Sequence, residues 1–165
     1  MILQTERLAL HELTQADAPF ILELLTSRGF MDNIGDRGVR DLAGAAGYIE
    51  RQREGYGVNG FGLWGADVKA TGERAGICGF VKREGLEHPD VGYAFLERFW
   101  GRGYATEAAA AALAYGRQTL GLQTIVAITA PHNKGSAAVL EKIGMRFTGM
   151  VTMPGYDTES SYFTT

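Results

Sequence analysis

Apolar and polar residues alternate in the first segment of the chain. Within residues 2–13, the apolar Leu8 and Leu10 alternate with the polar Arg7 and His11. Successive side chains of a strand point to opposite faces, so a period of two predicts that this segment is a first strand.

Two stripes with helical spacing follow. Residues 14–17 resemble a capping box with Asp in place of Glu, which predicts a helix start. Four apolar residues then fall on one helical face: Phe20, Ile21, Leu24 and Leu25. A second stripe is formed by Val39, Leu42, Ala46 and Ile49. We expect residues 29–38 to form the loop between the two helices and residues 55–60 to end the second one.

The middle of the chain changes to short apolar runs. Residues 61–67 and 75–83 predict a hairpin, because the polar segment 69–73 between them suits a turn. Residues 91–96 predict the next strand, which leads directly into a glycine-rich segment.

Helices and strands alternate in the last third. The predicted order is helix, strand, helix and two strands, at residues 106–120, 123–130, 136–143, 147–153 and 156–163. No linker or repeat divides the chain, so we expect a single domain over residues 1–165. Such alternation around one mostly antiparallel sheet is a mixed α/β architecture.

Composition narrows the function classes. The 165 residues carry a net charge of −3 without a basic run, which argues against a nucleic-acid partner. The single cysteine, Cys78, favours a reduced compartment. The longest apolar run, 108–115, is too short to cross a bilayer, so we expect a cytoplasmic protein without a membrane partner. The three histidines have no metal-ligand spacing, and no metal is expected.

Residues 98–107 carry the most specific chemistry. Gly101 and Gly103 allow the backbone to approach a ligand closely, and the alanine-rich helix that follows adds the positive end of its dipole. This combination predicts a cradle for a phosphate or pyrophosphate. A glycine-rich turn without a ligand is the alternative. A dinucleotide fingerprint is rejected, because the third glycine is missing and residues 121–130 contain no acidic residue.

A second segment, residues 133–145, combines a turn residue with a helix start. Asn133 carries both a donor and an acceptor. Ser136 is a candidate helix N-cap, and its hydroxyl could face a ligand instead. Both interpretations of Ser136 stay open.

These two segments resemble motifs of the GCN5-related N-acetyltransferase (GNAT) superfamily. Arg98-x-x-Gly101-x-Gly103 is similar to its pyrophosphate loop, and the run 100–108 looks like the RimJ/RimL-type branch. Residues 133–145 resemble the Asn-x-x-Ser…Glu-Lys-x-Gly-Phe motif, with Met145 in place of Phe. Residues 5–8 also resemble the opening of that branch, so the resemblance spans the chain; many relatives carry Arg where His11 stands.

The resemblance implies a fold. It is a twisted, mostly antiparallel sheet of six to seven strands flanked by about four helices. A V-shaped cleft would open between the fourth and fifth strands, here residues 91–96 and 123–130. The acyl thioester would lie in this cleft.

The resemblance also implies an activity, the direct transfer of acetyl from acetyl-CoA to a primary amine. The amine would belong to a protein N-terminus or a small molecule, and homodimers are common among relatives. Leu140 stands where some members carry a Tyr that protonates the departing thiolate. A non-catalytic acyl-CoA-binding sensor or interaction module is therefore the alternative.

Site residues follow from the same resemblance. Backbone amides of Arg102, Gly103, Tyr104, Ala105 and Thr106 would hold the pyrophosphate. The remaining coenzyme-binding candidates are Arg98, Gly101, Asn133 and Ser136, together with one amide of Ala94, Phe95 or Leu96 that would polarise the thioester.

Two residues carry the predicted proton transfers. Ser136 is the candidate donor to the thiolate, and Asp90 is the candidate base, acting through water. Asp90 could instead be a turn residue. Glu97 and Glu107 are the alternative bases, although a structural role at the helix start is the preferred interpretation of Glu107. Trp64 and Tyr93 belong either to the core or to the cleft.

Overall fold

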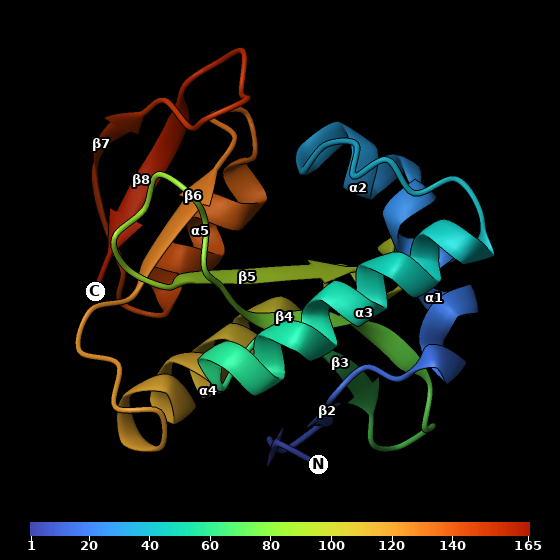
Figure 1. Cartoon of the computed structure of the whole chain (residues 1–165). Helices are drawn as coiled ribbons and strands as arrows, with labels where there is room; N and C mark the ends of the chain where they lie inside the picture. Colours follow the sequence, from blue (N-terminus) through green and yellow to red (C-terminus); the bar gives the residue numbers. More distant parts are fainter.

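An eight-stranded sheet forms the centre of the computed structural model, which describes all of residues 1–165 (Figure 1). Neighbouring strands follow the order β1-β2-β3-β4-β5-β6-β8-β7. All pairs are antiparallel except β5 and β6, which are parallel. The strands are β1 (Leu3–Gln4), β2 (Leu8–His11), β3 (Leu63–Val68), β4 (Arg74–Val81), β5 (Asp90–Phe95), β6 (Val126–Thr129), β7 (Arg146–Val151) and β8 (Ser160–Thr164).

Five α-helices accompany the sheet. They are α1 (Ala18–Thr26), α2 (Arg28–Asn33), α3 (Leu42–Asn59), α4 (Tyr104–Gln118) and α5 (Lys134–Lys142). The mixed α/β class and the order of the main elements are confirmed. The sheet has one strand more than the upper bound expected, and there is one additional helix; both differences arise in the first 33 residues.

The first segment is a small hairpin, so its prediction as one strand is wrong. β1 pairs with β2, with Leu3 opposite Leu10. The chain reverses at Thr5, whose hydroxyl accepts the Leu8 N–H at 2.9 Å. A Thr side chain that bonds a nearby backbone group competes with the sheet ladder and favours a turn. The alternating pattern continues through this turn and therefore conceals it.

Helix α2 lies where we expected a loop. Ser27 caps it by accepting the Phe30 N–H at 3.3 Å. The following helix, α3, continues through its internal glycines to Asn59. Gly60 ends it in a left-handed conformation at φ +78°.

Helix α4 packs closely on one face of the sheet. Its Gly116 sits so near that an added Cβ would lie 2.7 Å from the Phe80 ring, so the position requires glycine. Trp64 is 1% exposed and packs edge-on against Tyr115 of α4, with ring centroids 5.6 Å apart. Trp64 is therefore a core residue, and a role for it in the cleft is excluded by its burial.

The sheet opens between β5 and β6. These strands pair at one position only, Asp90 opposite Val126, and diverge beyond it. Figure 1 shows β6, β8 and β7 turning away from β5. The predicted V-shaped opening between these two strands is confirmed.

The single cysteine lies inside this structure. Cys78, on β4, is fully buried, and burial raises the pKa of its thiol to about 12. None of the helices is both long and apolar enough to span a membrane.

Candidate active site

A cavity of about 1020 Å³ occupies the opening between β5 and β6. Most of the predicted site residues line it: Asp90, Ala94, Phe95, Gly101, Gly103, Tyr104, Ala105, Thr106, Asn133 and Ser136. Leu96, Arg98 and Arg102 do not line it. The structure thus brings the two sequence segments, which are far apart along the chain, to one cavity.

The glycine-rich loop adopts the backbone that its sequence suggests. Gly101 and Gly103 have φ values of +74° and +80°, in the left-handed region that favours glycine. Gly103 is the N-cap of α4, so the first amides of this helix lack intrahelical partners at the cavity wall. No atom lies within 4 Å of where a Cβ of Gly101 would be. The loop therefore faces open space, and its amides fit an anion such as the diphosphate of coenzyme A.

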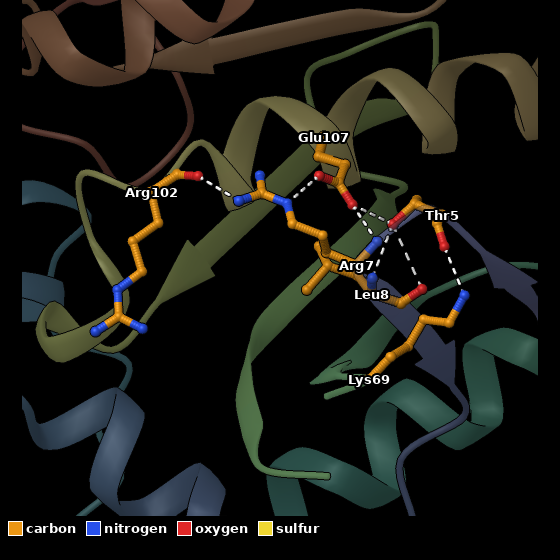
Figure 2. A network of polar contacts seen from close by, with 6 residues as sticks. All are labelled: Thr5, Arg7, Leu8, Lys69, Arg102 and Glu107. Carbon is orange, nitrogen blue, oxygen red and sulfur yellow. Dashed lines mark hydrogen bonds and ion pairs between the residues drawn. The ribbon is translucent and has the colours of Figure 1, made fainter. Parts of the chain in front are cut away.

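A network of polar contacts joins this loop and the start of α4 to the β1–β2 turn (Figure 2). Glu107 of α4 accepts hydrogen bonds from the Thr5 hydroxyl, from the Arg7 N–H at 2.9 Å and from Arg7 Nε at 2.8 Å. Arg7 Nη1 also donates to the Arg102 carbonyl at 2.8 Å, and its guanidinium lies 4.6 Å from the centre of the Tyr104 ring. The β1–β2 turn thereby fixes the loop, which supports the structural interpretation of Glu107.

Neither arginine of the loop reaches the cavity wall. Arg98 forms an ion pair with Glu23 at 3.1 Å. The Arg102 guanidinium lies 5.7 Å from the Phe99 ring, and Figure 2 shows it extending away from Arg7. In this arrangement neither side chain lines the cavity, whereas Gly103, Tyr104, Ala105 and Thr106 do.

Replacing Arg7 by alanine is expected to weaken coenzyme A binding by roughly fivefold, because the loop carbonyl at Arg102 loses its anchor. Isothermal titration calorimetry with coenzyme A measures this effect. Lys69→Ala is the matched control, since Lys69 donates to the Thr5 carbonyl at 2.9 Å in the same network without touching the loop. Equal losses in both variants would contradict an anchoring role for Arg7.

The second segment places a pair of hydroxyl groups in the cavity. Asn133, not Ser136, caps α5: its Oδ1 accepts the Ser136 N–H at 3.1 Å, so the N-cap interpretation of Ser136 is wrong. The Ser136 hydroxyl lies 2.9 Å from the Tyr93 hydroxyl, which also donates to the Ser136 carbonyl at 3.0 Å. Tyr93 therefore lines the cavity rather than the core, and burial raises the pKa of its hydroxyl.

Comparisons with known proteins agree with this geometry. Residues 7–146 match the family model described as the acetyltransferase (GNAT) domain. The chain belongs to the GNAT family.

Individual relatives of this chain were also found. YkkB of Bacillus subtilis (strain 168), an uncharacterized protein, is 44% identical over 102 residues, which are 60% of this chain and 57% of that protein. The match thus spans less than two thirds of YkkB. An acetyltransferase from Agrobacterium tumefaciens str. C58 is 31% identical, with a TM-score of 0.85 over 99% of this chain and 92% of that one.

The RimJ/RimL-type resemblance has a structural counterpart. RimL, a ribosomal L7/L12 α-N-protein acetyltransferase solved with coenzyme A, superposes with a TM-score of 0.84 over 99% of this chain and 96% of that one. Its sequence identity is 15%, so this likeness concerns the fold.

Asp90 begins β5 in this GNAT fold, so it is a strand residue rather than a turn residue. It is 2% exposed, and its Oδ2 pairs with Arg83 Nε. Its Oδ1 is buried without a hydrogen-bond partner. Burial raises the pKa of this carboxyl group to about 6, although the Arg83 charge opposes the shift.

Several residues of this GNAT site carry no motif and were missed from the sequence. Arg37, Tyr48 and Arg83 line the same cavity as Asp90. They come from the α2–α3 connection, from α3 and from the segment after β4. Only the folded chain brings them together. No cluster of His, Cys, Asp and Glu side chains suited to a metal ion occurs in the structure.

Proposed function

We propose that this GNAT protein transfers the acetyl group of acetyl-CoA directly to a primary amine, either a protein N-terminus or a small molecule. One observation carries the proposal: a single cavity is lined by the amides of the glycine loop, the Ser136–Tyr93 hydroxyl pair and Asp90. These groups supply an anion cradle, a proton donor and a proton acceptor, which are the groups that such a transfer needs.

The amide of Phe95 is our candidate for polarising the thioester carbonyl. The Leu96 N–H already donates to the Ala75 carbonyl at 3.0 Å. Amides along an antiparallel strand alternate in direction, so the Ala94 N–H points toward β4 as well. The Phe95 N–H then points to the edge where β6 diverges. An N–H there can stabilise the oxyanion of a tetrahedral intermediate.

The proton steps use the remaining groups. The amine nitrogen attacks the thioester carbonyl carbon, and the carbon–sulfur bond of the tetrahedral intermediate then breaks. The departing thiolate takes a proton from the Ser136 hydroxyl, and water in the cavity returns a proton to the Ser136 oxygen, so that no alkoxide remains. Asp90 accepts the amine proton. It lies three residues before Tyr93, or about 10 Å along the strand, so water would relay the proton. An α-amine, with a pKa of about 7.7 to 8.0, would need less help than a lysine side chain.

Activity is expected to fall as the pH drops below about 6, because only the ionised Asp90 carboxylate can accept a proton. The measurement is kcat/KM against pH for the wild type and for Asp90→Asn with the same acceptor. The ratio of the two profiles removes the titration of the acceptor amine. A ratio that stays constant between pH 5 and 8 would show that Asp90 is not the base.

The proposal is tested by thiol release from acetyl-CoA over a panel of amines and peptides, together with coenzyme A titrations. A folded protein that ignores the coenzyme at millimolar concentration would overturn it. Tight coenzyme binding without release across the panel would favour the sensor instead. That second candidate is supported by Leu140, which is 1% exposed and has no group to donate a proton.

The setting of the enzyme is part of the proposal. A single-domain protein that acts in the cytoplasm, as a monomer or a homodimer, is consistent with one cysteine and with a substrate such as acetyl-CoA.

A further inference from the structure

The cavity extends past the coenzyme loop to a second end, which we name the acceptor chamber. Two strands supply apolar lining there, β3 through Leu63 and β4 through Ile77 and Val81. Their register places Ile77 opposite Ala94 and Val81 opposite Asp90, so the chamber lies on the face of β5 that carries these two residues. Side chains alternate between the two faces along a strand, so Tyr93, which directly precedes Ala94, points to the opposite face of β5. Its hydroxyl lies beside that of Ser136 there.

Arg37 lines this chamber without a partner. It forms no hydrogen bond or ion pair, whereas the nearby Arg40 is fully engaged by Asp36. The positive charge of Arg37 acts on both Asp90 and Tyr48, and it lowers the pKa of each group while burial raises it. Arg37, Asp90 and Tyr48 all line the same cavity.

Only one of the three guanidinium nitrogens of Arg83 is paired. Its Nε binds Asp90, while its two Nη atoms make no hydrogen bond and the side chain is 25% exposed. A guanidinium presents its donors as a planar fork that matches a carboxylate. Arg83 thus retains donors for a second anion.

The charges of the chamber do not balance. Asp90 neutralises Arg83, and Glu159, an exposed residue of the β7–β8 connection, is the other carboxylate in the cavity lining. Lys134, Lys142 and His132 line the cavity near α5. No carboxylate lies within ion-pair distance of Arg37, so this arginine remains available to a ligand.

We propose that the acceptor carries a carboxylate a few bonds from its amine, and that Arg37 and the Nη atoms of Arg83 bind this carboxylate. The inference rests on the proposed acetyltransfer. It assigns the substrate class: an amino acid or an N-terminal peptide segment with an acidic group. The amine would point along β5 toward Phe95, and the apolar lining would cover an aliphatic part of the acceptor. Purely cationic acceptors such as polyamines are disfavoured by the same two arginines.

The test compares acceptors with and without the anionic group, with kcat/KM expressed per unprotonated amine because the carboxylate also makes the neighbouring amine more basic. Leucine is paired with leucinamide, and alanylglutamate amide is paired with alanylglutamine amide, which separates a main-chain carboxylate from a side-chain one. In at least one of the two pairs, we expect kcat/KM for the acidic acceptor to be about tenfold or more above kcat/KM for its neutral partner. Arg37→Gln should bring this ratio close to one, and Arg37→Glu should reverse it. Arg40→Gln, the matched control, should leave it unchanged.

A binding measurement separates this inference from the proposed function. Protein loaded with coenzyme A is titrated with N-acetylleucine and N-acetylleucinamide, and with the acetylated peptide pair, so that no turnover is needed. Preference for an acid that disappears in Arg37→Gln supports the inference even if no acceptor is acetylated. Equal binding within each pair, or no binding of either acid, overturns it, even if neutral amines are acetylated.

Discussion

Replacing Gly103 by valine is expected to weaken coenzyme A binding by roughly 10- to 100-fold, because a residue with a Cβ strongly disfavours the left-handed backbone that this position adopts. Gly103 caps α4 and presents the first free amides to the cavity. A side chain there would also approach Arg7 Nη2, which lies 3.4 Å from the Cβ position. The loop would relax toward another conformation, and its amides would no longer converge on one anion. Isothermal titration calorimetry measures the loss.

Gly121→Val is the matched control for backbone strain. Gly121 follows the other end of α4 with φ +70°, has no atom within 4 Å of its Cβ position and lies outside the cavity. Both variants should therefore lose stability in thermal unfolding, and only the change at Gly103 should lose coenzyme affinity. A normal dissociation constant for the Gly103 variant would refute the backbone cradle.

Ser136→Ala is expected to reduce kcat by about 100-fold or more while KM for acetyl-CoA changes little, because a positioned proton donor contributes that much to a transfer step. The hydrogen bond that caps the helix runs from the backbone N–H of Ser136 to Asn133 Oδ1 and does not involve the Ser136 hydroxyl. The cap should therefore survive the substitution. Steady-state kinetics with both substrates give the two constants.

Tyr93→Phe distinguishes the two hydroxyl groups. The Tyr93 hydroxyl lies 2.9 Å from that of Ser136, and either oxygen could be the donor in this bond. If Ser136 protonates the thiolate, the Phe variant should retain most of its turnover. A larger loss at Tyr93 than at Ser136 would transfer the donor role to the tyrosine.

Local patterns predicted the elements whose partners are close in the sequence. The strands 61–67 and 75–83 were expected from period and turn residues, and the structure places them at β3 and β4. The glycine loop was recognised because a left-handed backbone at Gly101 and Gly103 is a local demand. The hairpin at Thr5 was missed because its hydroxyl bond interrupts the strand without interrupting the hydrophobic pattern.

The site itself depends on contacts between distant residues. Ser136 and Tyr93 are 43 positions apart, and Arg7 and Glu107 are 100 apart. No single segment contains such a pair, so one sequence taken by itself gives no signal for it. Ser136 was named from a motif, and Tyr93 was left open between the core and the cleft. The pairing of their hydroxyl groups and the arginines of the acceptor chamber follow only from the folded chain.

The burial of Cys78 has a practical consequence for the thiol-release assay. A thiol with a pKa near 12 reacts very slowly with colorimetric thiol reagents while the protein is folded. The colour that develops during turnover then reports released coenzyme alone. Added denaturant should expose one further equivalent of thiol per chain, because the sequence contains a single cysteine. The same reagent therefore counts both product and unfolded protein, so an unstable variant can be recognised in the cuvette in which its activity is measured.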